Sequence, residues 1–410
     1  MNASATSGPR PLAVRNFRLL WLGETVSLLG DQFYLIGLPW LTLRVGGDGF
    51  TLGAVLMTAA VPRALFMLLG GAISDRLSPR AVMLVSNVLR ALAVGVLTFL
   101  VASGAIRLTH IYLLAAVFGT VDAFYHPSLM AIVPSLVSRD RLESANALVQ
   151  GSEQLSMLVG PAVAGVVIAA AGLTPAFGVD VLTFLFTVTT LLAMRVGKRA
   201  PAGVGENVLE QIGSGMRYAF REPAMRVMLI SVALLNLAIT GPASVGLPLL
   251  AEQRFGGAAA FGLMMSAFGG STLVGALLAG SVLKRVRLGR LMVLAPLIFA
   301  AALAGVGFAT SLPAAVTALA AMGLAAGALN VRAIAWLQGE TEPGYRGRVM
   351  SLVMFASVGL APLSLVVAGA VIGYGFAPLY LGAAVLTVAA TALAGATREV
   401  RSLGAVAAEA

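Results

Sequence analysis

Cysteine is absent from the 410-residue sequence, and histidine occurs only as His110 and His126. Disulfide scaffolds, thiolate metal sites and cysteine nucleophiles are therefore excluded, and two histidines are too few for a histidine-rich metal centre. The zinc-protease pattern H-E-x-x-H and the phosphate-binding pattern G-x-x-x-x-G-K-[ST] do not occur either. We therefore expect neither an enzyme nor an ATP-driven pump, and we expect no metal and no cofactor.

Charge is also scarce in this sequence. Only 11% of the residues are Asp, Glu, Lys or Arg, and 59% are hydrophobic before the 47 glycines are counted. Soluble domains are about 25% charged, so a water-soluble fold of this length could not cover its own surface. The long apolar runs do not alternate as the strands of a membrane barrel do. The composition therefore predicts an all-α integral membrane protein.

Twelve apolar runs are long enough to cross a bilayer, which takes about 20 residues in a helix. Charge clusters and Gly or Pro turns separate these runs. We predict twelve transmembrane helices, at 17–43, 51–74, 81–103, 109–137, 147–171, 176–195, 224–250, 262–283, 291–310, 314–338, 349–372 and 377–396.

Basic residues gather in the loops on one side of these helices. Of the 27 Lys and Arg residues, 21 lie there, whereas the opposite loops contain only Arg44, Arg107 and Arg254. Because cytoplasmic loops are enriched in Lys and Arg, we predict that both termini are cytoplasmic and that the protein is multi-pass in the cytoplasmic (inner) membrane. The net charge of +10 then reflects topology, so no nucleic-acid partner is expected.

A polar stretch at 196–223 divides the chain into two sets of six helices. We predict an N-terminal bundle at 1–195, a cytoplasmic linker with a surface helix at 196–223, and a C-terminal bundle at 224–410. The halves resemble each other weakly, since a Gly-x-x-x-[charged]-Arg pattern occurs at both 71–76 and 280–285. Such repetition is typical of transporters, and it predicts two six-helix bundles with pseudo-two-fold symmetry and inverted repeats.

The motif Gly71-Ala-Ile-Ser-Asp75-Arg76-Leu-Ser-Pro79-Arg80 follows the second run. Asp75 can interact with the N-terminus of a neighbouring helix, where the helix dipole favours an anion, and Arg76 can form ion pairs that break when the conformation changes. The motif resembles the G-x-x-x-D-R-x-x-R signature of the major facilitator superfamily. Gly71, Asp75 and Arg76 are therefore candidate gating residues. The alternative is a basic cytoplasmic loop in which Asp and Arg are adjacent by chance.

The fifth run contains Gly160-Pro161-Ala-Val-Ala164-Gly165. Small residues let two helix backbones meet, and proline kinks a helix. The segment resembles the G-P-x-x-G-G element of the antiporters in this superfamily, with Ala164 in place of one glycine. Gly160, Pro161 and Gly165 are candidate gating residues on this basis, and the alternative is ordinary small-residue packing.

Further runs resemble the drug-exporter branch that contains macrolide and siderophore exporters. They occur in order along the chain: Arg15-Asn-Phe-Arg18, Ser27-Leu-Leu-Gly30-Asp31, Phe124-Tyr-His-Pro127, Leu142-Glu-Ser-Ala-Asn146 and Arg346-Gly-Arg-Val-Met-Ser351. The resemblance covers all twelve predicted helices and implies a secondary transporter that exports its substrate.

Charged residues inside the predicted helices are candidates for the transport site, because a charge at mid-bilayer costs a few kcal/mol unless it faces a cavity or a partner. Asp31, Arg63 and Asp122 lie near one level of the membrane at a rise of about 1.5 Å per residue. Asp31 and Arg63 can form a static ion pair. Asp122 and His126, four residues apart on one face, can relay protons or simply bond each other.

The remaining candidates lie nearer the cytoplasm or on other helices. Glu24 shares a helix face with Asp31, and Glu153 is expected at a cytoplasmic gate. Arg332 and Trp336 can contact substrate or form part of a gate. We expect a structural role for Arg90 and an interfacial position for Asp180.

These observations predict a secondary active transporter, a proton-coupled exporter of hydrophobic or amphipathic small molecules that works by alternating access. The expected partners are such a substrate, protons and membrane lipids, and the protein is expected to be a monomer. Alternatives with the same fold are a lysophospholipid or lipid flippase and a metabolite carrier. From another class, the chain can be a sensor or assembly subunit that has lost transport, although the charges in mid-membrane argue against that.

Overall fold

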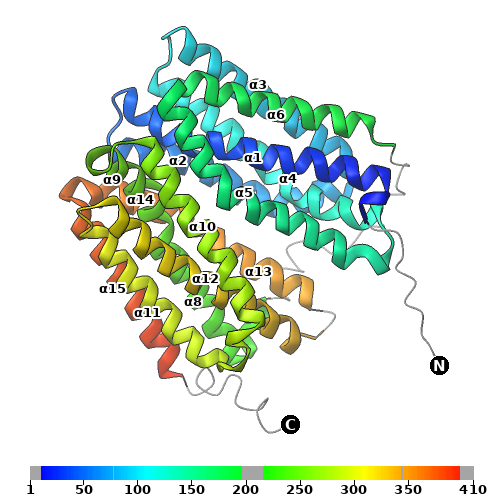
Figure 1. The fold of residues 1–410 in the computed structure, drawn as a ribbon. Helices are drawn as coiled ribbons and strands as arrows, with labels where there is room; N and C mark the ends of the chain where they lie inside the picture. The colour runs from blue at the N-terminus through cyan, green and yellow to red at the C-terminus, as the bar shows by residue number, and fades with distance from the viewer. Residues whose placement is uncertain (1–10, 77, 196–215, 343–344, 398–410) are drawn as a thin grey trace.

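The computed structural model describes residues 11–76, 78–195, 216–342 and 345–397, except for the side chains of 67–76, 284–285 and 346–347. In these residues, short turns connect long helices (Figure 1). The first half of the chain contains α1 (Arg15–Arg44), α2 (Gly49–Arg76), α3 (Pro79–Ala102), α4 (Leu108–Leu136), α5 (Leu142–Ala171) and α6 (Leu173–Ala193), with 3₁₀ turns η1 (Pro11–Ala13) and η2 (Arg139–Arg141).

The second half of the chain has helices that are more often broken. A π-helical turn separates two of them, and short 3₁₀ turns end two others. The elements are α8 (Pro223–Gly241), η3 (Pro242–Gly246), α9 (Leu247–Arg254), α10 (Ala258–Gly280), η4 (Val282–Arg285), α11 (Leu288–Gly307), α12 (Leu312–Glu340), α13 (Arg346–Val358), α14 (Ala361–Val371), η5 (Ile372–Tyr374) and α15 (Phe376–Ala396).

Eleven helices in the described part of the chain are long and apolar enough to cross a membrane. Three of these spans join more than one element, because η2 leads into α5, α8 continues through η3 into α9, and α13 continues through α14 into η5. Helix α1 is not among the eleven, although its 30 residues reach about 45 Å. Glu24, Asp31 and Gln32 lower its hydropathy. With α1 as the twelfth long helix, the predicted helical membrane fold is confirmed.

The two halves repeat one packing pattern. In the first half, α1 packs against α5 and α6, α3 packs against α4 and α6, and α2 packs against α4. In the second half, α8 packs against α13, α14 and α15, α11 packs against α12 and α15, and α10 packs against α12. Each contact of one half has its counterpart in the other, which is the pseudo-two-fold symmetry that the sequence predicts.

Single glycines make equivalent turns in the two halves. Gly172 stands between α5 and α6 with φ at 90°, and Gly375 stands between η5 and α15 with φ at 113°. Glycine adopts these left-handed values without the steric cost that a Cβ atom brings. The chain therefore reverses its direction within a very short turn before the last helix of each half.

The halves contact each other through α5 with α10 and through α2 with α14. These contacts are close because small residues meet. A Cβ atom added to Gly165 would lie 3.1 Å from the Cα of Gly262, and one added to Gly53 would lie 3.1 Å from the Cα of Gly369. All four glycines lie toward the loop end that the charge pattern predicts to be external.

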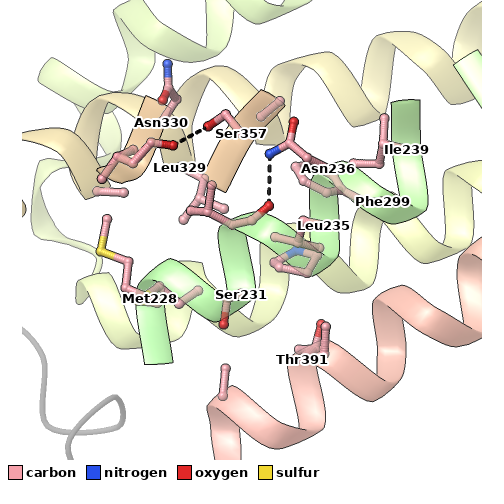
Figure 2. A pocket seen from close by; sticks show the side chains of 18 of the residues that line it. Met228, Ser231, Leu235, Asn236, Ile239, Phe299, Leu329, Asn330, Ser357 and Thr391 are labelled. Carbon is pink, nitrogen blue, oxygen red and sulfur yellow. Dashed lines mark hydrogen bonds between the residues drawn. The ribbon is translucent and has the colours of Figure 1, made fainter. Parts of the chain in front are cut away.

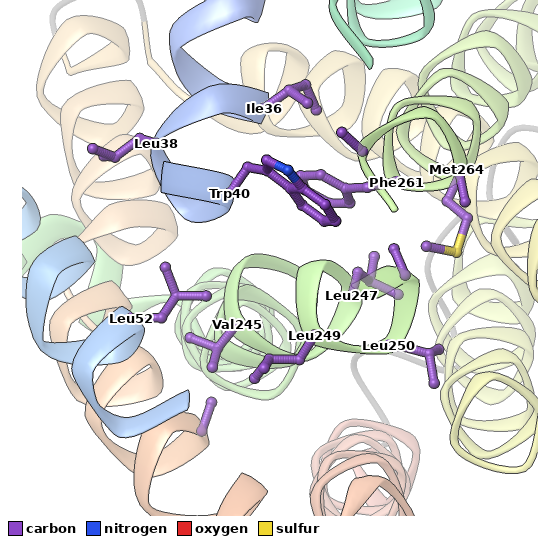
Figure 3. Packing of buried hydrophobic residues seen from close by; sticks show 14 of the residues in the cluster. Ile36, Leu38, Trp40, Leu52, Val245, Leu247, Leu249, Leu250, Phe261 and Met264 are labelled. Carbon is purple, nitrogen blue, oxygen red and sulfur yellow. The ribbon is translucent and has the colours of Figure 1, made fainter. Parts of the chain in front are cut away.

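One buried apolar cluster joins the halves at this end. Trp40 of α1 and Leu52 of α2 belong to the same cluster as Leu249 of α9 and Phe261 of α10 (Figure 3). Toward the opposite end, the buried apolar residues form two separate clusters, one around Phe17 in the first half and one around Met228 in the second. The structure is therefore closed at the predicted external end, and the groups α1–α6 and α8–α15 diverge from there (Figure 1).

The predicted linker falls largely outside the described residues. Residues 216–221 are helical, at the end of the predicted surface helix, whereas 196–215 are not described. The boundaries 1–195, 196–223 and 224–410 therefore remain a prediction.

Candidate proton and substrate sites

The buried charges of the first half centre on Asp122 of α4. Its Oδ1 atom accepts a short hydrogen bond from Nη2 of Arg90 on α3, and its Oδ2 atom lies 3.1 Å from Nε of Arg63 on α2. The side chain of Arg90 is 2% exposed, whereas that of Arg63 is 39% exposed. Asp122 thus joins one arginine inside the bundle to one at an accessible surface.

Aromatic rings surround the guanidinium group of Arg90. Its Cζ atom lies 4.3 Å from the ring centre of Tyr125, 5.3 Å from that of Phe118 and 5.8 Å from that of Phe184. The negative faces of such rings attract a cation, and a buried charge is tolerated when it is paired. This environment explains how α3 accommodates a fully buried arginine.

The partners of the other candidates differ from those that the sequence indicates. Arg63 pairs with Asp122, and Asp31 has no ion-pair partner within 4 Å in the described part of the chain. Glu24 is buried and accepts a short hydrogen bond from the hydroxyl of Tyr125. His126 packs edge-on against the Tyr125 ring, with ring centres 6.3 Å apart. No hydrogen bond or ion pair between His126 and Asp122 is found among the described residues, because both oxygens of Asp122 face arginines.

Asp180 differs most from its expected place. It is 0% exposed on α6, whereas the sequence suggests a position at the membrane interface. A helical stripe explains this burial, since Phe177, Phe184 and Leu191 on the same face are also fully buried. Arg90 follows the same rule, since Met83, Val94 and Leu97 share its buried face. In both cases, the spacing of the apolar neighbours is the sequence signal that reveals the burial.

The Gly160–Gly165 segment of α5 lies at two helix contacts. Gly160 packs against Gln32 of α1, and Gly165 packs against Gly262 of α10. Between them, the main-chain N–H of Ala162 donates a hydrogen bond of 2.9 Å to Oγ of Ser266 on α10. The predicted gating segment thus contacts both a helix of its own half and a helix of the other half.

The first predicted gating motif is only partly visible. Gly71, Asp75 and Arg76 lie in the last turns of α2, and their side chains are outside the described residues. Arg80, just beyond this motif, donates from Nε to the carbonyl of Leu191 at 2.8 Å. The start of α3 is therefore fixed to the end of α6.

The last three candidates lie toward the predicted cytoplasmic end. Glu153 is half-buried on α5. Arg332 of α12 donates hydrogen bonds to the carbonyl oxygens of Leu283 at 2.8 Å and Val286 at 3.1 Å, so it holds the turn that follows α10. Trp336 is half-buried one helical turn further on and packs against the apolar cluster around Met228.

A cavity of about 340 Å³ lies within the second half, between α8, α10, α11, α12, α13 and α15 (Figure 2). None of its lining residues is charged. Its wall is formed mainly by Met, Phe, Leu and Ala side chains, such as Met228 and Phe299. The polar groups are few and neutral: Ser231, Asn236, Asn330, Ser357 and Thr391. Small-molecule sites have this composition, an apolar wall with a few polar groups that orient the ligand.

Comparisons with known proteins identify the family of this chain. The family model MFS_3, described as transmembrane secretion effector, matches residues 6–410. The multidrug efflux pump Tap of Mycolicibacterium fortuitum is 25% identical over 353 residues, which cover 83% of this chain and 85% of the pump. Macrolide efflux protein A of Streptococcus pyogenes is 23% identical, over 82% of this chain and 84% of that protein.

A further relative and a solved structure extend the comparison. The enterobactin exporter EntS of Escherichia coli O1:K1 / APEC is 23% identical, over 82% of this chain and 80% of the exporter. The crystal structure of the nucleoside transporter NupG has the same fold, with a TM-score of 0.70 and 15% identity over 92% of this chain and 98% of that chain. The predicted resemblance to the major facilitator superfamily is confirmed. The chain belongs to the MFS_3 family of this superfamily, the transmembrane secretion effectors.

Proposed function

We propose that this protein is a proton-coupled exporter of hydrophobic or amphipathic small molecules that works by alternating access. The observation that carries the proposal is the separation of charge between the halves. The first half has a buried network of acids and arginines, and the second has a cavity whose lining contains no charged residue. One half is suited to proton binding, and the other is suited to an apolar substrate.

The cavity supports the substrate class. An apolar molecule gains about 25 cal/mol for each Å² of apolar surface that it buries, and the Met and Phe side chains of the wall adapt to different shapes. Asn236 and Asn330 offer neutral donors and acceptors to an amphipathic molecule. The relatives that export drugs, macrolides and enterobactin are consistent with such a substrate.

The buried acids support coupling to protons. An ionised carboxylate in mid-membrane is unfavourable unless it is paired or hydrated. In this conformation Arg63 and Arg90 hold Asp122 in its ionised form. Departure of Arg63 leaves Asp122 with a single cation, which makes proton binding easier, and the return of Arg63 favours release of the proton. Asp31 is the second proton-binding residue in this scheme, and His126, adjacent to Tyr125, relays protons to the accessible side.

Alternating access requires gates at both ends. The closed end, where Gly165 meets Gly262, is the external gate, and Gly160 and Pro161 form the bend about which α5 moves. Opposite to it, Gly71, Asp75 and Arg76 form the cytoplasmic gate with Glu153. Arg332 and Trp336 stabilise the second half at the same level.

The same proposal includes topology. The bundles 1–195 and 224–410 rock about the substrate, and the linker 196–223 connects them in the cytoplasm. Both termini are cytoplasmic, and the protein acts as a monomer in the inner membrane with membrane lipids around it. Export, rather than uptake, is the direction that the relatives support.

The test is transport in proteoliposomes that contain the purified protein. Vesicles with an acidic lumen, which stands for the cell exterior, receive radiolabelled erythromycin outside. We expect accumulation of erythromycin beyond that of protein-free vesicles, in which this weak base is trapped passively, and the excess should disappear when nigericin collapses the pH gradient. Asp48→Asn, in the loop between α1 and α2, is the matched control for a lost carboxylate and should transport as the wild type does.

Two results would overturn the proposal. Accumulation that is insensitive to nigericin means that protons are not the coupling ion. Movement of a fluorescent lysophosphatidylethanolamine without movement of erythromycin means that the protein is a lipid flippase.

A further inference from the structure

We propose that Asp180 of α6 binds a proton and shares it with Asp31 of α1, so that α1 and α6 together hold a second proton-binding site beside the Asp122 ion pairs. This inference rests on the proposed proton coupling. It assigns a role to a residue that the transport scheme above does not use.

Asp180 is fully buried and lies directly against the main chain of α1. A Cβ atom added to Gly30, the residue before Asp31, would be 2.9 Å from Oδ1 of Asp180. Glycine at position 30 therefore makes room for the carboxyl group. Helix α6 packs closely on both α1 and α3, so the carboxyl group is enclosed by helices of its own half.

Neither carboxyl oxygen of Asp180 has a well-oriented hydrogen bond from a described residue, although the Thr183 side chain lies close enough to interact with the carboxyl group. The hydroxyl of Thr183, which is nearby, donates instead to the main-chain oxygen of Asp180 at 2.7 Å. An ionised carboxylate without a partner is costly inside a protein, and the proton-bound form avoids most of that cost. An enclosed carboxyl group of this kind is suited to hold a proton.

Two further groups on α1 have buried polar atoms. Oδ1 of Asp31 has no hydrogen-bond partner among the described residues, and the same is true of the hydroxyl of Tyr34, whose side chain is 7% exposed. Asp31 and Tyr34 are three residues apart on α1 and therefore share a face. Both interact electrostatically with Asp180. The hydroxyl of Tyr34 can donate and accept a hydrogen bond, so it is suited to pass a proton between the two acids.

No arginine or lysine of the described residues forms an ion pair within 4 Å with Asp31 or Asp180, although Arg90 interacts electrostatically with both. Both arginines contact Asp122, and Glu24 bonds to Tyr125. Asp180 interacts electrostatically with Asp31 and Tyr34 on α1 and with Arg90 on α3. Other charged or titratable groups inside the helices of this half include Glu24 on α1, Arg63 on α2, Asp122, Tyr125 and His126 on α4, and Glu153 on α5. Four of the acids, Glu24, Asp31, Asp122 and Asp180, share only two arginines. Two carboxyl groups that interact so closely titrate as a unit and keep one proton between them.

The exchange is balanced in atoms and charge. The proton leaves the carboxyl group of Asp180 and binds the carboxylate of Asp31, directly or through the hydroxyl of Tyr34, and the reverse transfer restores the first state. Asp31 exchanges its proton with the accessible side, and Asp180 is the buried store. No oxidant, reductant or co-reactant is needed.

The test compares Asp180→Asn with Asp31→Asn and with the loop control Asp48→Asn in the proteoliposome assay. The amide is nearly isosteric with the acid but cannot release a proton. We expect Asp180→Asn to exchange erythromycin between the two sides of the membrane in the absence of a gradient, and to lose accumulation driven by a pH gradient. A purely structural, permanently neutral Asp180 predicts full accumulation by Asp180→Asn, and that result overturns the inference.

A second variant keeps the inference testable if Asp180→Asn does not fold. Asp180→Glu retains a titratable group at a changed distance from Asp31, so the pH dependence of accumulation should move, and an unchanged pH profile overturns the inference. The two proposals fail separately. Wild-type protein without proton-driven accumulation refutes the proposed function, whereas equal accumulation by the wild type and Asp180→Asn refutes only the role of Asp180.

Discussion

Removal of the Asp122 carboxylate should destabilise the protein far more than removal of its exposed partner. In Asp122→Asn, the guanidinium group of Arg90, which is 2% exposed, remains buried without its counter-ion. Loss of one member of a buried pair costs about 3–5 kcal/mol. The Tyr125 and Phe118 rings face the cation with and without the substitution, so they do not change this difference, and the loss should be at least about 3 kcal/mol.

Arg63 offers the comparison, because it contacts the same carboxylate. Its side chain is 39% exposed, so the charge that Arg63→Gln removes is less enclosed by protein than that of Arg90. Exposed ion pairs contribute about 0–1 kcal/mol. The two single variants should therefore differ by about 2 kcal/mol or more, which is more than tenfold in the folded-to-unfolded ratio.

The assay is unfolding of purified protein in detergent, followed by helical circular dichroism against increasing sodium dodecyl sulfate. A double variant, Arg90→Met with Asp122→Asn, tests the cause of the loss, since it removes the unpaired cation as well and should be more stable than Asp122→Asn alone. Equal losses in Arg63→Gln and Asp122→Asn refute the reasoning, and so does a double variant that is less stable than Asp122→Asn.

Four further predictions concern other parts of the molecule. Gly160→Leu should reach the membrane but not transport, because its side chain would displace Gln32 of α1; full activity in the transport assay would contradict this. Asn236→Asp should abolish erythromycin binding by placing a charge in the apolar cavity, with Asn236→Ser as the control that should still bind in equilibrium dialysis. Asp75→Asn should change disulfide cross-linking between cysteine pairs introduced at the predicted cytoplasmic end, and identical cross-linking with and without the change would exclude that gate. The pKa of Asp48 is lowered by hydrogen bonds from the main-chain N–H and the hydroxyl of Thr51. The ionised carboxylate therefore stabilises the fold at neutral pH, and this stabilisation is lost as the pH falls through the folded-state pKa. Asp48→Ala should weaken the acid dependence of the melting temperature, and an unaltered dependence would contradict the assignment.

The sequence predicts the fold well because each membrane span must satisfy its own backbone hydrogen bonds. The predicted run at 81–103 corresponds to α3 at Pro79–Ala102, and the run at 109–137 corresponds to α4 at Leu108–Leu136. The break inside the run at 224–250, where η3 interrupts the α-helix at Pro242–Gly246, was not predicted. Apolar composition continues through that break, so hydropathy does not detect it.

The partners of the buried charges are harder to predict from sequence. Distance along a helix places Asp31, Arg63 and Asp122 near one level of the membrane, but pairing depends on the rotation of each helix, which changes by about 100° per residue. Arg63 pairs with Asp122 because α2 packs on α4. For Asp180, depth along α6 alone suggests the interface, whereas the periodic positions of Phe177 and Phe184 show the face that is buried.

The absence of charge from the cavity wall has a consequence for how such a protein changes over generations. Substitutions at distant sites usually add in their effects on stability. A mutation at Phe299 or Met322, both in the cavity wall, reshapes the apolar surface without touching the Arg90–Asp122 pair in the other half. Under the proposed function, a lineage of such chains can therefore acquire resistance to a new compound by a few substitutions in one half, while its energy source is inherited intact in the other.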